Sequence, residues 1–126
     1  MSIEQVSTTD APVPGGSYSQ GIVADGFLWT AGFGPQDPET GEIPTGVAAQ
    51  TRQVLENVRA TLAVRGLDLE DVVKVTTHLQ HLEQDFAEYD AAYREMFDEP
   101  YPARTTVGSD LLGILVEIDV VARLRG

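Results

Sequence analysis

Residues 72–97, VVKVTTHLQHLEQDFAEYDAAYREMF, decide the fold because their apolar pattern changes period halfway along. The first part alternates as a half-buried strand does. It predicts one face of Val73, Val75, Thr77 and Leu79 and an opposite face of Lys74, Thr76, His78 and Gln80. The second part has helical spacing, with an apolar face of Phe86, Tyr89, Tyr93, Met96 and Phe97. Asp85 with Glu88 three residues later matches a capping box, so we expect the helix to begin there.

Upstream of this stretch, the sequence predicts a hairpin and a first helix. Residues 22–33 alternate and then become apolar around a turn signal at Asp25-Gly26. The side chains expected on one side of this hairpin are Phe27, Trp29, Ala31 and Phe33. A helix is expected from Thr45 or Gly46 to a terminating Gly66. Its apolar positions are Val47, Val54, Leu55, Val58 and Leu62.

Downstream, Pro100 and Pro102 end the second helix, and residues 104–109 and 114–124 are rich in β-forming side chains. The predicted order is β, β, α, β, α, β, β, with both helices long enough to cross over one face of a sheet. We therefore predict one domain spanning residues 1–126, an α+β two-layer sandwich. In it, one mixed β-sheet is covered on one face by two α-helices.

The last predicted strand has one apolar and one mixed face. The side chains expected to face the helices are Ile114, Val116, Ile118, Val120 and Ala122, and those expected to face away are Leu115, Glu117, Asp119, Val121 and Arg123. No remaining element of the chain is expected to cover this second, partly apolar face. It therefore predicts burial against other copies of the chain in a homo-oligomer.

The composition excludes several kinds of chemistry. With no cysteine in 126 residues, disulfides, thiolate catalysis and cysteine-based metal sites are excluded. The two histidines, His78 and His81, have no third ligand to complete a zinc site. We interpret both as surface or interface side chains and expect no metal site.

The charge and the short apolar runs limit the partners and the location. Twenty acidic residues against eight basic ones give a formal charge of −12, and no basic stripe is visible. Nucleic-acid binding is therefore disfavoured. The apolar runs fall far short of the ~20 residues that a membrane-spanning helix needs. The N-terminus also lacks the blocks of a secretion signal. We expect no membrane partner and a cytoplasmic location.

Four segments carry a specific resemblance: GGSYSQG at 15–21, TAGFGP at 30–35, PARTTVG at 102–108 and LVEIDVVA at 115–122. In this order around two helices, they resemble the RidA (YjgF, L-PSP) family of enamine/imine deaminases. The resemblance implies a chorismate-mutase-like fold in a homotrimer with a site in each cleft between subunits. It also implies hydrolysis of 2-imino acids to 2-oxo acids and ammonia without a cofactor.

The resemblance assigns roles to four residues of this chain. Arg104 corresponds to the arginine that binds the substrate carboxylate, for which a planar guanidinium offers two charge-assisted bonds. Glu117 corresponds to the glutamate that positions or activates water. Tyr18 corresponds to a tyrosine lining the cleft, and Gly32 to a glycine whose backbone approaches the substrate. From the residues alone, a surface arginine at a strand start is the favoured interpretation of Arg104, and a solvated or interface-paired strand glutamate is the favoured interpretation of Glu117.

The remaining expected substrate-binding positions depart from the family pattern. Ala31 stands where many members have serine, Phe33 where glutamine is frequent, Thr106 where cysteine is frequent and Asp90 where asparagine is common. These changes bear on the identity of the substrate more than on the type of reaction. Apolar side chains at 31 and 33 would favour imines with larger or hydrophobic side chains.

Two other functions stay open at this point. One is a trimer that binds 2-oxo acids through the same arginine without turnover. The other is an endoribonuclease, which fits poorly with a charge of −12 and no stacking platform.

Overall fold

Six strands form one sheet in the computed structural model, which describes residues 2–126. The strands are β1 (Glu4–Val6), β2 (Gly21–Ala24), β3 (Phe27–Thr30), β4 (Val72–Leu79), β5 (Ala103–Gly108) and β6 (Val116–Arg123), in the spatial order β1-β2-β3-β6-β4-β5. All neighbours are antiparallel except β4 and β5, which are parallel. The predicted mixed sheet is therefore confirmed.

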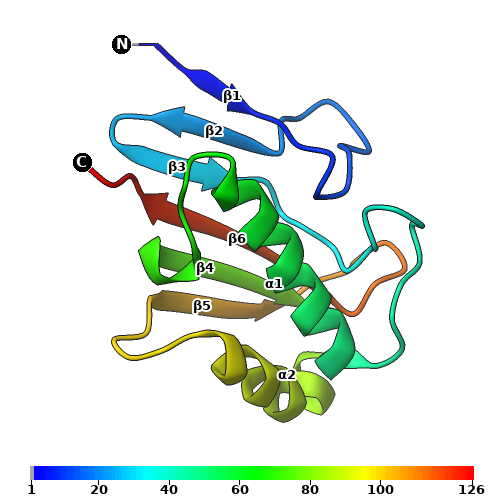
Figure 1. The fold of residues 1–126 in the computed structure, drawn as a ribbon. Helices are drawn as coiled ribbons and strands as arrows, with labels where there is room; N and C mark the ends of the chain where they lie inside the picture. The colour runs from blue at the N-terminus through cyan, green and yellow to red at the C-terminus, as the bar shows by residue number, and fades with distance from the viewer. Residues whose placement is uncertain (1) are drawn as a thin grey trace.

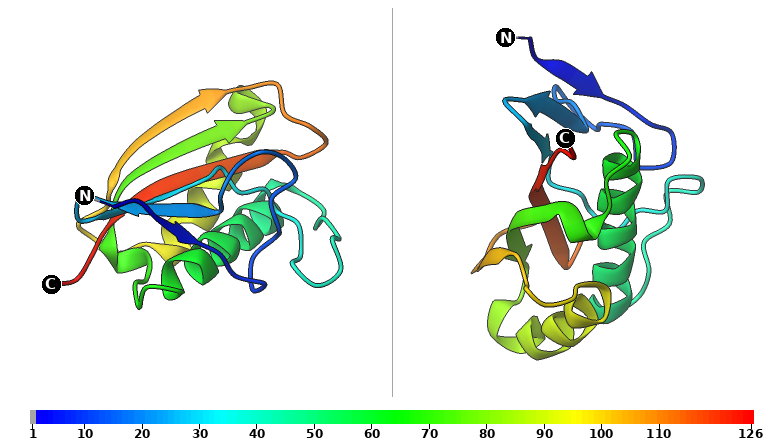
Figure 2. Two further views of the ribbon diagram at one scale, coloured as in Figure 1. Left: turned by 90° about the horizontal axis from the view of Figure 1, so that it is seen from above. Right: turned by 60° about the vertical axis from the view of Figure 1, so that its left-hand side comes forward.

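Two helices, α1 (Val47–Ala63) and α2 (Leu82–Met96), accompany the sheet; in Figure 1, α1 crosses in front of the strands and α2 lies below β5. Figure 2 shows the strands in one layer and both helices in the other. A short 3-10 helix, η1 (Leu69–Asp71), precedes β4. Helix α2 is the crossover that joins the parallel pair β4 and β5, as parallel neighbours require. The predicted α+β two-layer sandwich, with two helices on one face, is confirmed.

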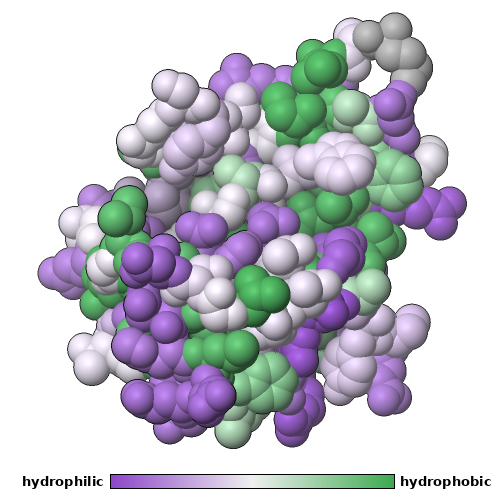
Figure 3. All heavy atoms as spheres, turned by 180° about the vertical axis from the view of Figure 1, so that it is seen from behind, coloured by the Kyte–Doolittle hydropathy of each residue, from purple (hydrophilic) through white to green (hydrophobic). Residues whose placement is uncertain are grey.

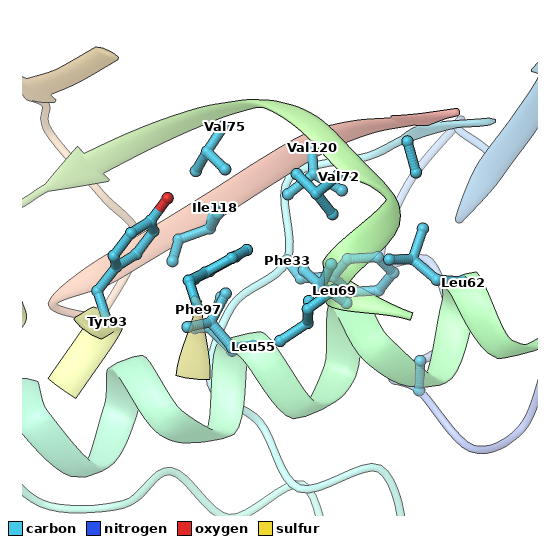
Figure 4. Close-up of a cluster of buried hydrophobic side chains, with 14 of the residues drawn as sticks. Phe33, Leu55, Leu62, Leu69, Val72, Val75, Tyr93, Phe97, Ile118 and Val120 are labelled. Atoms are coloured by element: carbon cyan, nitrogen blue, oxygen red, sulfur yellow. The ribbon is translucent and has the colours of Figure 1, made fainter. Parts of the chain in front are cut away.

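The hydrophobic core lies between the helices and the sheet. Leu55 and Leu62 of α1 point toward Ile118 and Val120 of β6 (Figure 4), and all four are essentially fully buried. The predicted inward face of β6 is confirmed, because Val116 and Ala122 are buried as well. This alternation turns the intervening side chains to the other face of the sheet.

Two turns explain where elements end. Asp25 and Gly26 both have positive φ angles, 53° and 86°, which joins β2 to β3 in the predicted hairpin. Gly66 has a φ of 71°, and the amide of Leu67 donates to the carbonyl of Leu62 at 3.2 Å beyond the last turn of α1. The predicted bounds of this helix are confirmed to within a few residues.

Helix α2 begins at Leu82, three residues before the predicted start. The residue before it, His81, makes no side-chain capping bond, and the predicted capping box at Asp85 and Glu88 is wrong. Asp85 already lies in the first turn, where its amide donates to the carbonyl of His81 at 2.9 Å. Leu82 packs against the core, and this tertiary contact accounts for the earlier start.

Two side chains were predicted on the wrong face. The pairing of β4 with β6 has a bulge between Val72 and Lys74, so Val72 is buried and Val73 is 43% exposed. Phe33 does not share a side with Trp29. The chain bends after β3, the amide of Phe33 donates to the carbonyl of Ile118 at 2.9 Å, and its ring enters the core (Figure 4). The N-terminal strand β1 was not predicted because it is only three residues long.

The face of the sheet opposite the helices, here called the open face, is not covered by any element of the described chain. Figure 3 shows the molecule from this side, with hydrophobic and hydrophilic side chains interleaved. Trp29, Val73 and Val107 are all substantially exposed. Between residues 2 and 126, neither helix is long and apolar enough to cross a membrane.

Candidate active site

A pocket of about 560 Å³ lies at the open face, where several segments distant in sequence meet. The loop before β2, the segment after β3, strands β4 and β6 and the loop after β5 all contribute. Its main polar and glycine positions are Tyr18, Gly32, His78, Ser109 and Glu117. We call it the open-face pocket. Three of the predicted site residues, Tyr18, Gly32 and Glu117, therefore lie in one place.

Glu117 points into this pocket because of its place in β6. Its neighbours Val116 and Ile118 are buried on the helix side, so strand alternation turns Glu117 to the open face. A β-carbon added at Gly32 would lie 2.7 Å from the Glu117 carboxylate oxygen Oε2. Only glycine at position 32 lets the backbone approach this carboxylate so closely.

Tyr18 lies at the rim of the open-face pocket and is about half exposed. Its hydroxyl oxygen accepts a hydrogen bond of 3.0 Å from the backbone amide of Gly15. This contact closes the loop upon itself and leaves one face of the ring available. The tyrosine is thus held in position without being buried.

Arg104 lies elsewhere, on the helix side of the sheet edge. It is paired in register with Val75, whose side chain is fully buried under the helices. Glu117 is paired with His78 and faces the opposite way. Within one chain, the arginine and the glutamate therefore stand on opposite faces of the sheet.

The guanidinium of Arg104 is fixed by helix α2. Its Nη1 donates to Oδ1 of Asp90 at 2.8 Å, while Arg94 donates to the other oxygen of Asp90 at 3.0 Å. The guanidinium carbon also lies 4.6 Å from the ring centroid of Tyr93 and 5.4 Å from that of Tyr89. No partner among residues 2–126 bonds Nε or Nη2 of Arg104, so one edge of the fork is open.

The pKa values around Arg104 follow from burial and ion pairing. Burial would raise the pKa of Asp90, but the hydrogen bonds and charges of Arg104 and Arg94 hold it below its ordinary value. Burial would lower the pKa of Arg104, and the contacts with Asp90 and the nearby tyrosines raise it instead. Burial also raises the pKa of Tyr93. Arg104 and Asp90 are therefore both charged at neutral pH.

A second pocket, of about 310 Å³, lies beside Arg104. We call it the arginine pocket. Its walls are Asp90, Tyr93, Arg94, Tyr101, Pro102 and Arg104. The combination of one cation with an open edge and two aromatic rings suits a small organic carboxylate. Asp90, expected from the sequence to touch the substrate, lies here beneath the arginine.

Three other expected site residues line neither pocket. Phe33 belongs to the hydrophobic core, and Ala31 is held by a backbone bond of 2.9 Å from its amide to the carbonyl of Gln20. Thr106 follows Arg104 on the helix side of β5, and its buried hydroxyl has no hydrogen-bond partner among the described residues. The expected effect of Phe33 on substrate choice therefore has no support in the single chain.

Sequence reasoning missed His78 and Ser109. The Nδ1 atom of His78 lies 2.6 Å from the Ser109 hydroxyl, and both line the open-face pocket with Glu117. The strand pattern already placed His78 on the face away from the helices. What the sequence could not show was that β4 pairs with β6, which brings His78 opposite Glu117. No group of three or more His, Asp or Glu side chains suited to a metal ion occurs within residues 2–126.

The fold and the two pockets together define the class of this protein. It is a two-layer α+β protein that has a pocket with a carboxylate on the open sheet face and an arginine at the edge of the sheet. A family model described as "Endoribonuclease L-PSP" matches residues 8–124. A RutC family protein of Pyrococcus horikoshii is 47% identical over 122 residues, covering 94% of this chain and 96% of that protein. The 2-iminobutanoate/2-iminopropanoate deaminase of Escherichia coli is 38% identical over 125 residues, covering 95% of this chain and 97% of the deaminase.

The same fold is found in solved structures. RidA from an Antarctic Psychrobacter species has a TM-score of 0.91 and 35% identity to this chain, covering 96% of this chain and 99% of that one. The chain therefore belongs to the RidA (YjgF, L-PSP) family.

Proposed function

We propose that this chain is a hydrolytic deaminase that converts 2-imino and enamine acids to 2-oxo acids and ammonia. The open edge of Arg104 carries the proposal, because a fixed guanidinium with two free donors is a ready binding site for a carboxylate. The name of the Escherichia coli relative, 2-iminobutanoate/2-iminopropanoate deaminase, supports the same chemistry.

The reaction needs a group that manages the protons of water. In the proposed step, water adds to the C=N carbon, Glu117 accepts one of its protons, and the nitrogen gains a proton. Glu117 then returns its proton to the carbinolamine nitrogen, the hydroxyl proton is lost, the C–N bond breaks, and ammonia leaves with the electron pair while a C=O bond forms. Glu117 lies in a pocket with a glycine backbone and a tyrosine ring, where a small planar imine could lie beside it.

The two groups of one chain stand on opposite faces, so we propose that the site is completed by a neighbouring copy. The edge strand β5 with Arg104 of one subunit would meet the open-face pocket of the next. The exposed Trp29, Val73 and Val107 on the open face support burial between copies. We propose a homotrimer, the assembly that the family resemblance implies. Sedimentation as a monomer at micromolar concentration would count against it.

The decisive experiment couples an amino-acid oxidase to the protein and follows the disappearance of the imine with a trapping nucleophile. Wild type should accelerate the loss above the uncatalysed rate, and Arg104→Ala should abolish this acceleration. Arg104→Lys should also lose most of it, since an ammonium cannot make the two-pronged contact. The matched control is Arg52→Ala, which removes an exposed arginine paired with Glu95 on the outer helical surface.

The other outcomes of this experiment separate the alternatives. Tight binding of 2-oxo acids without any acceleration would favour a binding protein. RNA cleavage abolished by Arg104→Ala would favour a nuclease. The structure argues against the nuclease, because five of the eight basic residues are paired with carboxylates: Arg52, Arg59, Arg94, Arg104 and Arg125. Such pairing leaves little positive charge to attract phosphates.

A further inference from the structure

His78 lies in the open-face pocket and has no role in the proposed function as stated so far. Its Nδ1 lies 2.6 Å from the Ser109 hydroxyl, a short hydrogen bond for these atoms. No partner among residues 2–126 bonds its other ring nitrogen, Nε2. A histidine tied at one nitrogen and free at the other has a fixed ring and one nitrogen available for proton transfer.

Ser109 is itself held in place. Its backbone amide donates to the carbonyl of Leu79 at 2.9 Å, continuing the pairing of β4 with β5 by one residue. Two residues further on, the amide of Leu111 donates to Oε1 of Gln80 at 2.6 Å. The loop after β5 is thus fastened at two points directly after the histidine, Leu79 and Gln80, and this holds the Ser109 hydroxyl beside the imidazole.

The register of the sheet sets His78 directly across from Glu117 on the open face. Cross-strand pairs of this kind bring side chains into contact range. Both residues line the same pocket, which also contains Tyr18. An imidazole and a carboxylate therefore share one wall of the space where an imine would bind.

The charged groups around His78 are mostly acidic. The groups of β6 on this face are Glu117 and Asp119, the loop after β5 contributes Asp110, and the strand of His78 itself contributes Lys74. Across β5 it is paired with Val107, which does not titrate. Burial raises the pKa of Asp119, the charge of His78 opposes this rise, and that of Glu117 adds to it. Lys74 bonds the Thr105 hydroxyl at 2.9 Å and lies opposite Val121 in the register of the sheet, whereas His78 lies opposite Glu117.

We propose that His78 is the second proton-transfer residue of this site, donating a proton to the nitrogen that leaves as ammonia. This inference rests on the proposed imine hydrolysis. Glu117 takes the proton of the attacking water, and the imidazolium gives its Nε2 proton to the imine nitrogen as the C–O bond forms. Glu117 then returns its proton to the amine nitrogen, and the neutral imidazole accepts the hydroxyl proton of the carbinolamine as the C–N bond breaks and ammonia leaves with the electron pair. Protons gained and lost therefore balance over one turnover, and Ser109 positions the ring.

The test compares His78→Gln with wild type in the coupled imine assay between pH 5.5 and 9. Glutamine can keep the bond to Ser109 but cannot exchange protons at neutral pH. We expect kcat to fall about 100- to 10,000-fold with little change in KM, the range for losing one acid-base group. The pH dependence of kcat should also flatten. His81→Gln is the matched control, because His81 lies at the start of α2 outside this pocket.

Ser109→Ala is the second variant and does not depend on how His78→Gln folds. It leaves the imidazole in place but frees its Nδ1, so kcat should fall severalfold and the pH profile should shift while KM stays constant. An unchanged kcat and an unchanged pH profile in His78→Gln would overturn the inference. If His78→Gln does not fold, an unchanged kcat and pH profile in Ser109→Ala would overturn it instead. If wild type accelerates imine loss and only Arg104→Ala abolishes it, the proposed function stands and the role of His78 is refuted. No acceleration by wild type would overturn both.

Discussion

Replacing Asp90 by asparagine tests how the negative charge of Asp90 affects substrate binding and stability in the arginine pocket. Asp90 accepts hydrogen bonds from Arg104 at 2.8 Å and Arg94 at 3.0 Å, so two cations share one carboxylate. Asparagine can keep the oxygen facing Arg104 but loses the negative charge. The change therefore raises the local charge of the three groups from +1 to +2 without removing the shape of the site.

This change has two effects of opposite sign. A bound substrate carboxylate on the open edge of Arg104 no longer meets the charge of Asp90. Interactions between partly exposed charges typically measure up to about 1 kcal/mol. We therefore expect KM for a 2-imino acid to fall roughly fivefold. The free protein, in contrast, loses the attraction within the pocket and should be destabilised by about 1 kcal/mol at neutral pH.

The stability effect has a defined pH dependence. Because the pKa of Asp90 is lower in the folded protein than in the unfolded chain, its charge stabilises the fold above the unfolded value of about 3.9. That contribution is lost as the pH falls through the folded pKa. Urea unfolding of wild type and Asp90→Asn at fixed protein concentration should therefore differ at pH 7 and converge in acid. The control is Glu95→Gln, which removes an exposed partner of Arg52 and should have a smaller effect.

The result that would refute this reasoning is a higher KM in Asp90→Asn than in wild type. It would mean that the charge of Asp90 is needed to hold the guanidinium, and that repulsion of the substrate is the weaker effect. Equal unfolding curves at pH 7 would contradict the stability argument separately.

Three further changes test other parts of the structure. Gly32→Ala places a β-carbon 2.7 Å from the Glu117 carboxylate and should displace it, lowering kcat about 10- to 100-fold in the imine assay with little change in thermal stability. Unchanged kcat would show that this carboxylate does not need its observed position. Thr106→Val removes a buried hydroxyl without a partner among the described residues and should raise the free energy of unfolding by about 1 kcal/mol, measured in urea. A loss of stability instead would indicate an undetected partner. Gly66→Ala, at a φ of 71° with open space around it, should cost about 1 kcal/mol from backbone strain alone.

The sequence predicted those parts of the fold that depend on local pattern. The alternation in β6 gave the correct buried face from Val116 to Ala122, and Gly66 marked the end of α1. Val73 was placed on the wrong face because a bulge adds one residue to β4, and period-two alternation cannot show where a strand gains a residue. The start of α2 was misplaced because packing of Leu82 outweighed a capping pattern.

The candidate site was less accessible to prediction, because it depends on pairing between distant segments. Family resemblance located Arg104 and Glu117, but their positions on opposite faces follow from the register of β5 and β6 with β4. His78 was interpreted as a surface or interface side chain, since nothing in its own neighbourhood in sequence indicates a contact with Glu117 or with the Ser109 hydroxyl. Contacts between strands far apart in sequence are not encoded in any local window.

The placement of β6 has a consequence for synthesis of the chain. This strand comes last among those described, yet it lies between β3 and β4 at the middle of the sheet. Until it leaves the ribosome, the hairpin of β2 and β3 and the unit of β4, α2 and β5 have no common partner, and each exposes an unpaired inner edge. Nascent chains stopped before Val116 should therefore be prone to edge-to-edge aggregation and depend on chaperones. Pairing of this single strand would then join two fragments with open inner edges into one continuous sheet.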